Sequence, residues 1–325
     1  MKLLEVENLQ ISFDSGRQEA VVVDDISFSI GKGKTVALIG ESGSGKSVTS
    51  QAILGLLPEN GRITGGSINF HSENLVAMSE KELQQIRGKR ISMIFQDASV
   101  SLNPTMKIGK QVTEGLRFHR RINRNERKRE ALRLLMLVGF ENPSEIYHRY
   151  PGELSGGMKQ RALIALAISC NPELIIADEP TTALDVTIQK QILDLMEDYK
   201  KRTNTSFLLI THDFGLVAEY ADRVLVMFNG RIVEEADVYT LFENPLHPYT
   251  KGLMASIPRI DSPKETLLTV KDAEKSGHSY EGMRFAPESL TKKQGSDLEA
   301  SDLVEVEPGH WVRFYTERQE VAYEK

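Results

Sequence analysis

The chain contains a single cysteine, Cys170, among 325 residues. One cysteine cannot form an internal disulfide, which suits a reducing cytoplasm. Long apolar stretches are also missing: no run approaches the roughly eighteen residues that span a bilayer, and no charged-then-apolar leader precedes Leu3. We therefore expect a protein that lies outside the bilayer.

An excess of positive charge is missing as well. The formal net charge is −6, whereas proteins that depend on nucleic-acid phosphates carry concentrated basic surface. One basic run, Arg120–Arg124, leads into a segment where Glu126 and Glu130 alternate with further basic residues. This alternation favours a solvated helix face over a nucleic-acid surface. We expect no nucleic-acid partner.

What the chain does contain is a phosphate-binding loop. Its residues are Gly40, Glu41, Ser42, Gly43, Ser44, Gly45, Lys46 and Ser47. The loop fits G-x-x-x-x-G-K-[ST] and follows the apolar run Thr35–Ile39, which predicts strand, loop and then helix. The glycines let backbone N–H groups surround phosphate oxygens at the positive end of the helix. Lys46 is expected to pair with β- and γ-phosphate oxygens of ATP, and Ser47 to ligate Mg²⁺.

A second nucleotide element is an apolar run that ends in two carboxylates. Residues Leu174–Ala177 have the composition of a strand buried on both faces, and Asp178 and Glu179 follow directly. Asp178 is placed to hold Mg²⁺ through its water shell, and Glu179 to orient and deprotonate an attacking water.

A third element lies between these two. Ser155 is a good N-cap for a helix from Met158 to Ser169, and Gly156 and Gly157 follow it. A helix start of this kind is another anion site. Two phosphate-binding helix ends in one chain allow either one nucleotide wrapped by the chain or two nucleotides shared with a second copy.

These three elements together resemble the ATP-binding subunit of ABC transporters. Ser155, Gly156 and Gly157 match the signature motif of that family, while the loop and the acidic strand end match its Walker A and Walker B motifs. The resemblance implies an α/β fold of the P-loop NTPase class, with a RecA-like core, an antiparallel β subdomain and a helical subdomain. It also implies a head-to-tail dimer in which Ser155 and Gly157 reach the γ-phosphate that the partner's Walker A holds.

Smaller motifs follow the order expected of that family. Gln96 resembles the Q-loop glutamine that touches Mg²⁺ and attacking water, and His212 resembles the switch histidine that contacts the γ-phosphate. Asp185 resembles the D-loop aspartate, and it is equally suited to cap a helix from Val186 to Lys200. Phe13 resembles the aromatic that stacks on adenine, although a core Phe fits its alternating segment nearly as well.

Nucleotide contacts are also expected of Val48, which follows Ser47. We predict an ATPase domain over residues 1–235, with a helical subdomain at about 97–170, and a C-terminal extension over 236–325. The interval between Gln96 and Ser155 is too short for the long coiled coils of chromosome-maintenance ATPases. No internal repeat indicates a tandem cassette.

The C-terminal part narrows the resemblance. Residues Asn244–Thr250 resemble the C-terminal motif of the peptide and nickel importer branch of the family. Taken physically, two prolines and an aromatic predict only a rigid docking turn.

Further on, the chain departs from relatives in that branch that carry four cysteines for an iron–sulfur cluster. The corresponding positions hold Met283, Ser289, Ser296 and Phe314. None is a thiolate, so no iron–sulfur cluster is expected. The sequence leaves open whether this tail is a packed small domain or a partly ordered extension.

The resemblance implies a peripheral ATPase on the cytoplasmic face of the cell membrane that powers peptide import. Its implied partners are two transmembrane permease subunits, an extracytoplasmic solute-binding protein and a second ABC ATPase subunit, in a heterodimer rather than the alternative homodimer. Three other functions stay open: a nickel or metal-chelator importer, a soluble ABC ATPase acting on nucleic acid or ribosomes, and a scaffold that binds nucleotide without hydrolysis. Intact Glu179 and His212 speak against the scaffold.

Overall fold

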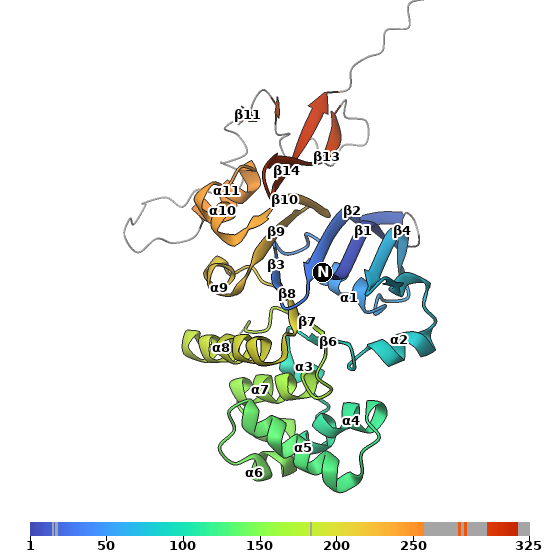
Figure 1. Ribbon diagram of the computed structural model, residues 1–325, viewed down its shortest axis with the longest axis vertical. Helices are drawn as coiled ribbons and strands as arrows, with labels where there is room; N and C mark the ends of the chain where they lie inside the picture. The colour runs from blue at the N-terminus through green and yellow to red at the C-terminus, as the bar shows by residue number, and fades with distance from the viewer. Residues whose placement is uncertain are drawn as a thin grey trace, which may run out of the picture.

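The computed structural model describes residues 1–14, 16, 19–182, 184–256, 279–280, 283–284 and 298–317. Figure 1 shows a central sheet with an antiparallel sheet beside it, a group of helices at the lower end and the C-terminal strands at the upper end. Among the described residues, none of the helices has the length and apolar character that crossing a bilayer requires.

The central sheet has the strand order β11-β12-β14-β10-β9-β3-β8-β7-β6, and β13 pairs with β14. Its strands are β3 (Thr35–Ile39), β6 (Ile91–Ile94), β7 (Leu174–Asp178), β8 (Ser206–Ile210), β9 (Arg223–Phe228), β10 (Arg231–Asp237), β11 (Ser279–Tyr280), β12 (Met283–Arg284), β13 (Leu298–Glu307) and β14 (His310–Glu317). The five from β9 to β6 along this order are parallel. Every residue of β3, β7 and β8 is buried, because parallel strands are covered on both faces.

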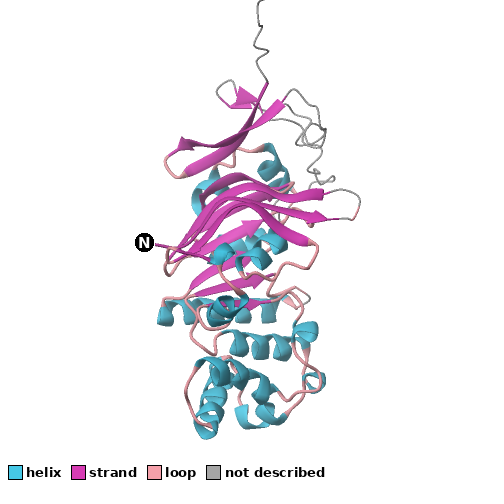
Figure 2. Cartoon of the chain, turned by 90° about the vertical axis from the view of Figure 1, so that its right-hand side faces the viewer, coloured by secondary structure: helices cyan, strands magenta, loops and turns pink. Residues whose placement is uncertain are grey.

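The second sheet has the order β2-β1-β4-β5. Its strands are β1 (Lys2–Asp14), β2 (Glu19–Gly31), β4 (Gly61–Phe70) and β5 (Glu73–Asn74). Leu4, Ile26 and Ile68 from this sheet share one buried cluster with Leu38 and Leu225 of the central sheet. The antiparallel sheet therefore packs against β3 of the central sheet. Figure 2 shows the strands as one block, with helices on either side of it.

Helices surround these sheets and form a separate group between β6 and β7. The helices are α1 (Lys46–Ile53), α2 (Glu80–Ile86), α3 (Ala98–Ser101), α4 (Ile108–His119), α5 (Arg124–Leu137), α6 (Pro143–His148), α7 (Gly156–Ala167), α8 (Val186–Thr203), α9 (Phe214–Tyr220), α10 (Val238–Glu243) and α11 (Pro248–Ala255), with 3-10 turns η1 (Leu75–Ala77) and η2 (Pro151–Glu153).

Helices α3 to α7 lie in the interval where the sequence predicts a helical region. On α5, Ala131, Leu134 and Leu135 are fully buried, as their helical spacing predicts. Helix α7 ends at Ala167, two residues earlier than predicted. The division of the chain at residue 235 stays a prediction, and β10 runs across that position.

The C-terminal strands join the central sheet. Residue Glu234 of β10 pairs with Val312 of β14, and the buried side chains of Val312 and Phe314 cluster with Leu246. The β13–β14 hairpin is thus packed against the rest of the chain. For this part of the tail, the packed alternative is the one observed. Trp311 lies at the surface of the hairpin and is 36% exposed.

Two of the four positions compared with cluster-binding cysteines are described. Met283 lies in β12, and the buried phenyl ring of Phe314 lies in β14. Ser289 and Ser296 lie outside the described residues.

The predicted docking turn over residues 244–250 is wrong for its last three residues, which are helical, while residues 244–247 lie outside any helix. Pro248 occupies the first position of α11, where proline is favoured because its missing N–H is not needed, and Tyr249 is buried.

Candidate functional site

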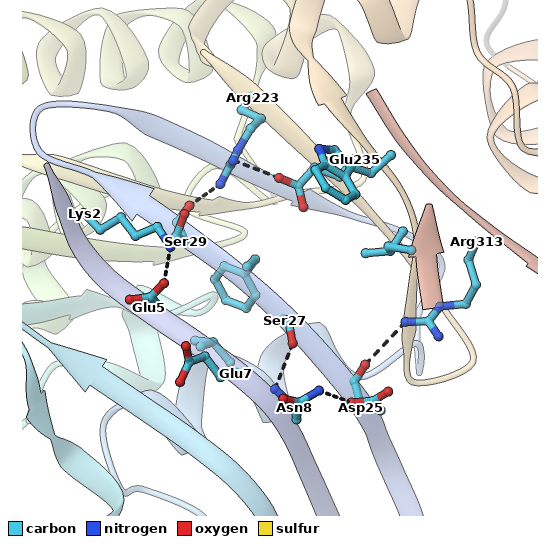
Figure 3. A pocket seen from close by; sticks show the side chains of 14 residues that line it. Lys2, Glu5, Glu7, Asn8, Asp25, Ser27, Ser29, Arg223, Glu235 and Arg313 are labelled. Carbon is cyan, nitrogen blue, oxygen red and sulfur yellow. Dashed lines mark hydrogen bonds and ion pairs between the residues drawn. The ribbon is translucent and has the colours of Figure 1, made fainter. Parts of the chain in front are cut away.

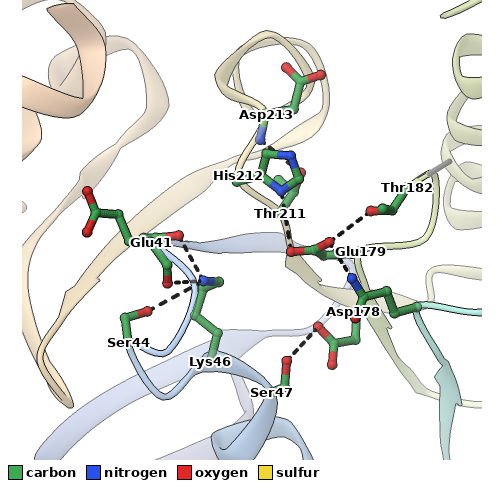
Figure 4. Close-up of polar contacts among 12 residues, drawn as sticks. Glu41, Ser44, Lys46, Ser47, Asp178, Glu179, Thr182, Thr211, His212 and Asp213 are labelled. Atoms are coloured by element: carbon green, nitrogen blue, oxygen red, sulfur yellow. Dashed lines mark hydrogen bonds and ion pairs between the residues drawn. The ribbon is translucent and has the colours of Figure 1, made fainter. Parts of the chain in front are cut away.

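The phosphate loop connects β3 to α1 in a shape that requires glycine at two positions. A Cβ on Gly40 would lie 2.1 Å from the carbonyl oxygen of Met227, which is too close for any side chain. Gly45 has a φ of 109°, a conformation that L side chains rarely adopt. The predicted strand, loop and helix are present, and the loop wraps around the side chain of Lys46 (Figure 4).

Lys46 lies inside this loop and is only 6% exposed. Its Nζ donates to the carbonyl oxygens of Gly40 at 2.8 Å and Glu41 at 2.7 Å, with the hydroxyl of Ser44 at 3.5 Å. Burial lowers the pKa of Lys46, and the neighbouring carboxylates oppose that shift. The loop therefore holds the Lys46 ammonium at the N-terminal end of α1, where phosphate oxygens would bind.

Ser47 and Asp178 come together although 131 residues separate them. The Ser47 hydroxyl donates to Oδ1 of Asp178 at 3.2 Å. Burial raises the pKa of Asp178, and the hydrogen bond from Ser47 opposes this effect. A hydroxyl and a buried carboxylate are hard oxygen ligands of the kind that Mg²⁺ takes beside nucleotide phosphates, so the pair fits that ion.

Glu179 is the centre of a hydrogen-bond network (Figure 4). Nε2 of Gln96 donates to its Oε2 at 2.8 Å, and Nδ1 of His212 lies 3.3 Å from its Oε1. The structure thus brings together three side chains that the sequence predicted for catalysis. Thr182, which the sequence analysis missed, also donates to Oε2 at 2.9 Å. The sequence signal for this contact was the position of Thr182, three residues after Glu179, where a turn brings the two side chains together.

The backbone at Glu179 is unusual. Its φ is 47°, in the left-handed region, and its N–H donates to the carbonyl oxygen of Ile210 at 2.8 Å. This bond ties the residue after β7 to the end of β8 and directs the carboxylate toward His212, as Figure 4 shows. A non-glycine residue in this region costs about 1–2 kcal/mol.

The signature segment begins α7. Ser155 caps the helix by accepting from the N–H of Met158 at 3.4 Å, as predicted, and both Ser155 and Gly156 are exposed. A Cβ on Gly157 would lie 3.0 Å from Cγ2 of Ile188, so α7 approaches α8 closely there.

Asp185 caps α8 by accepting from the N–H of Ile188 at 3.0 Å. This bears out the capping role, while a role across a dimer interface stays a prediction. Ala183, its neighbour in the motif, lies outside the described residues.

Two further predicted nucleotide contacts, Val48 and Phe13, pack against the main core. Val48 is half-buried on α1 and packs against the main core. Phe13 is half-buried on β1, opposite Gly61 of β4, where a Cβ would lie 2.9 Å from its ring. Stacking of Phe13 on adenine stays a prediction.

A separate hollow of about 510 Å³ lies between the antiparallel sheet and the β13–β14 hairpin (Figure 3). It shares no residue with the phosphate loop. Arg223 and Glu235 form an ion pair of 2.8 Å in it, and Lys2 is paired with Glu5. Because these charges already have partners within the chain, the hollow is a less convincing ligand site than the loop.

Comparison with known families agrees with this geometry. Residues 23–182 match the family described as ABC transporter, and residues 233–288 match the family described as oligopeptide/dipeptide transporter, C-terminal region. The first match contains both the phosphate loop and the acidic strand end.

Individual relatives extend the match over most of the chain. The oligopeptide transport ATP-binding protein AppD of Bacillus subtilis is 50% identical over 88% of this chain and 88% of its own length. OppD of the same organism is 53% identical over 82% of this chain and 75% of its own. OppD of Escherichia coli is 45% identical over 82% and 79%.

Solved structures show the same fold. The ATP-binding cassette MJ0796, a dimer in a post-hydrolysis state bound to ADP and Pi, matches with a TM-score of 0.66 and 26% identity over 72% of this chain and 98% of that one. CbiO1 of Clostridium perfringens matches with a TM-score of 0.64 and 26% identity over 75% and 91%. With its phosphate loop, signature helix and C-terminal region accounted for, the chain belongs to the ATP-binding subunits of the oligopeptide and dipeptide ABC transporter family.

Proposed function

We propose that this chain hydrolyses MgATP to drive the import of peptides through a binding-protein-dependent transporter. The observation that carries the proposal is the Glu179 carboxylate, held by Gln96, Thr182 and His212 beside the loop that contains Lys46. A general base needs such a held position, and a phosphate site needs such a cation. The peptide cargo rests on relatives named as oligopeptide and dipeptide transport proteins.

The loop residues bind the nucleotide. Lys46 exchanges the carbonyl oxygens that it contacts here for β- and γ-phosphate oxygens, and backbone N–H groups of the loop donate to the same phosphates. Ser47 and Asp178 would hold Mg²⁺, which when bound would supply positive charge beside the phosphate oxygens. Val48 and Phe13 complete the nucleotide contacts from α1 and β1.

The hydrolytic step then depends on Glu179. Its carboxylate accepts a proton from the attacking water, and Gln96 orients that water by donating from the other side. His212, whose side chain is 66% exposed, is available to turn toward the γ-phosphate. A Glu that accepts hydrogen bonds from three directions is restricted to few rotamers, which favours one productive geometry.

The nucleotide is expected to lie between two cassettes. Ser155, Gly156 and Gly157 are placed at an exposed helix start, so they can donate to the γ-phosphate held by a partner cassette, with Asp185 near the same interface. MJ0796, a similar ATP-binding cassette, is a dimer in two solved structures, one of them bound to ADP and Pi. We favour a second, different ATPase chain as the partner, with a homodimer as the alternative.

The other expected partners are two transmembrane permease subunits and an extracytoplasmic solute-binding protein. The chain would then lie on the cytoplasmic face of the cell membrane, with the region after Gln96 against the permease. Closure of the two cassettes on ATP would move the permease subunits, and hydrolysis would reopen them.

Purification from gently solubilised membranes of the native host tests this proposal. We expect two polytopic permease subunits, a second cassette and a lipid-anchored binding protein that retains peptide. A binding protein that retains nickel or a metal chelator would replace the cargo and keep the transport role. Recovery with ribosomes or DNA in the soluble fraction would contradict transport.

A further inference from the structure

A tyrosine from the C-terminal part of the chain contacts the phosphate loop directly. The hydroxyl of Tyr249, on α11, accepts a hydrogen bond of 2.8 Å from the backbone N–H of Glu41. The two residues are 208 positions apart, and Tyr249 is only 1% exposed. Helix α11 therefore reaches the loop with a buried polar atom, where a lost hydrogen bond is costly.

The residue that it contacts is held from both sides. The carbonyl oxygen of Glu41 accepts from Nζ of Lys46 at 2.7 Å, while its N–H donates to Tyr249. When Lys46 turns to phosphate, the carbonyl loses this donor, but the N–H keeps its acceptor. The turn before β10 adds one more support, because the N–H of Gly230 donates to the carbonyl oxygen of Ser44 at 3.0 Å.

Tyr249 is itself held in place. Its ring lies 4.2 Å, centroid to centroid, from the ring of Phe228 at the end of β9. Pro248 begins the helix, and Nδ1 of His247 accepts from the N–H of Tyr249 at 3.1 Å. A hydroxyl on a ring fixed in this way can define the position of its donor.

A buried carboxylate anchors the segment before α11. Glu234 on β10 is fully buried and accepts from the N–H of Leu246 at 2.7 Å and from the N–H of His247 at 3.1 Å. Nε2 of His310, from the β13–β14 hairpin, lies 2.8 Å from the same carboxylate. The C-terminal hairpin thus shares a carboxylate with the segment that leads to Tyr249.

We propose that Tyr249 is a positioning residue for nucleotide binding: its hydroxyl holds the Glu41 end of the phosphate loop in the binding conformation. The helix that carries it belongs to the C-terminal region that distinguishes this family, so that region contributes to the nucleotide site. This inference rests on the proposed role of the loop in binding MgATP.

The test is the Tyr249→Phe variant of the full chain, which keeps the ring and removes the hydroxyl that accepts from the N–H of Glu41. Isothermal titration with MgADP is expected to show a Kd about tenfold weaker than wild type, because the Glu41 N–H loses its partner. Tyr220→Phe is the matched control, since the Tyr220 hydroxyl donates at 2.8 Å to Asp194, outside the loop. Its Kd is expected to equal that of wild type.

Hydrogen exchange of the ligand-free protein gives a second readout that does not need nucleotide. Peptides covering residues 40–44 are expected to exchange faster in Tyr249→Phe than in wild type, and at an unchanged rate in Tyr220→Phe. Equal Kd and equal exchange in Tyr249→Phe and wild type would overturn the inference while leaving the proposed function intact. Equal weakening in both variants would overturn it too. A wild-type chain that binds no MgADP would overturn the proposed function as well.

Discussion

The two helix starts that we propose as phosphate-binding sites, at Lys46 and at Gly156, differ in how many contacts support them. At the Walker A end, Lys46 is buried, Gly40 packs against the backbone of Met227, and Tyr249 and Gly230 support the loop from two other elements. At the signature end, Ser155 and Gly156 are exposed, and the support seen there is the cap of α7 and its approach to α8.

This difference indicates which interactions one chain supplies alone. The Walker A end is preorganised before nucleotide arrives, so binding there costs little ordering. At the signature end Ser155 and Gly156 are exposed, which fits the proposal that a second cassette contacts them. A chain with one well-supported helix start and one exposed helix start fits the proposed pairing of two cassettes.

The largest expected effect separates chemistry from binding. Glu179→Gln should lower ATP turnover by at least about a hundredfold, because an amide cannot accept the proton from water. Titration calorimetry should show MgADP binding within about twofold of wild type. Glu173→Gln is the matched control, since this carboxylate pairs with His71 and Arg90 away from the loop. A Glu179→Gln variant with wild-type turnover would remove that residue from the role of base.

A smaller effect tests the outward half-site. Ser155→Ala should lower turnover by about ten- to a hundredfold in the assembled transporter, because the partner's phosphate loses a donor. MgADP binding by the isolated chain should not change. Asn123→Ala controls for the lost helix cap, because Asn123 caps α5 by accepting from two backbone N–H groups. Weakened MgADP binding by isolated Ser155→Ala would argue that one chain uses both ends on a single nucleotide.

A third prediction concerns stability and tests the support of the Walker A end by the segment before α11. Glu234→Ala should lower the free energy of unfolding by about 3 kcal/mol, because two buried N–H groups and His310 lose their acceptor. Urea unfolding measures the change. Glu145→Ala is the control, since Glu145 is half-exposed beside Arg149 and such pairs contribute about 0–1 kcal/mol. Equal losses in the two variants would contradict a specially supported Walker A end.

The smallest effect depends on pH. Burial lowers the pKa of His247 to about 4, whereas an unfolded histidine titrates near 6.5. The unfolded chain therefore binds the extra proton first, and stability is lost as pH falls from about 6.5 toward 4. The contribution from His247 should be about 1 kcal/mol lower at about pH 5.5 than at about pH 7.5.

His247→Asn tests this effect. Asn keeps a cap acceptor for Tyr249 and does not titrate, so its loss of stability between the two pH values should be smaller by that amount. Urea unfolding of both proteins at both pH values gives the comparison. An identical pH dependence in variant and wild type would exclude His247 as its source.

The sequence predicted the parts of this site that local chemistry determines. The strand, loop and helix around Lys46 follow from glycine spacing and an apolar run, and Ser155 was recognised as a cap from its own residue type. Gln96 and His212 were assigned by their order in the chain, and the structure places both beside Glu179. Parallel strands bring their carboxyl ends to one edge, which explains why order alone sufficed.

Other features could not be found in this way. The contact between Tyr249 and Glu41 has no local pattern, because it depends on how α11 packs after the whole sheet has formed. In the sequence, Glu234 is only one of two adjacent glutamates in β10. Its importance comes from its burial, and burial is a property of the completed fold.

The left-handed backbone at Glu179 has a consequence for the history of such a chain. A glycine there would relieve about 1 kcal/mol of backbone strain, but only by removing the carboxylate that we propose as the base and that Gln96 and Thr182 contact. Stability and turnover thus pull this position in opposite directions. Selection for heat resistance alone should therefore tolerate the loss of the carboxylate at residue 179. Selection for ATP turnover should retain it.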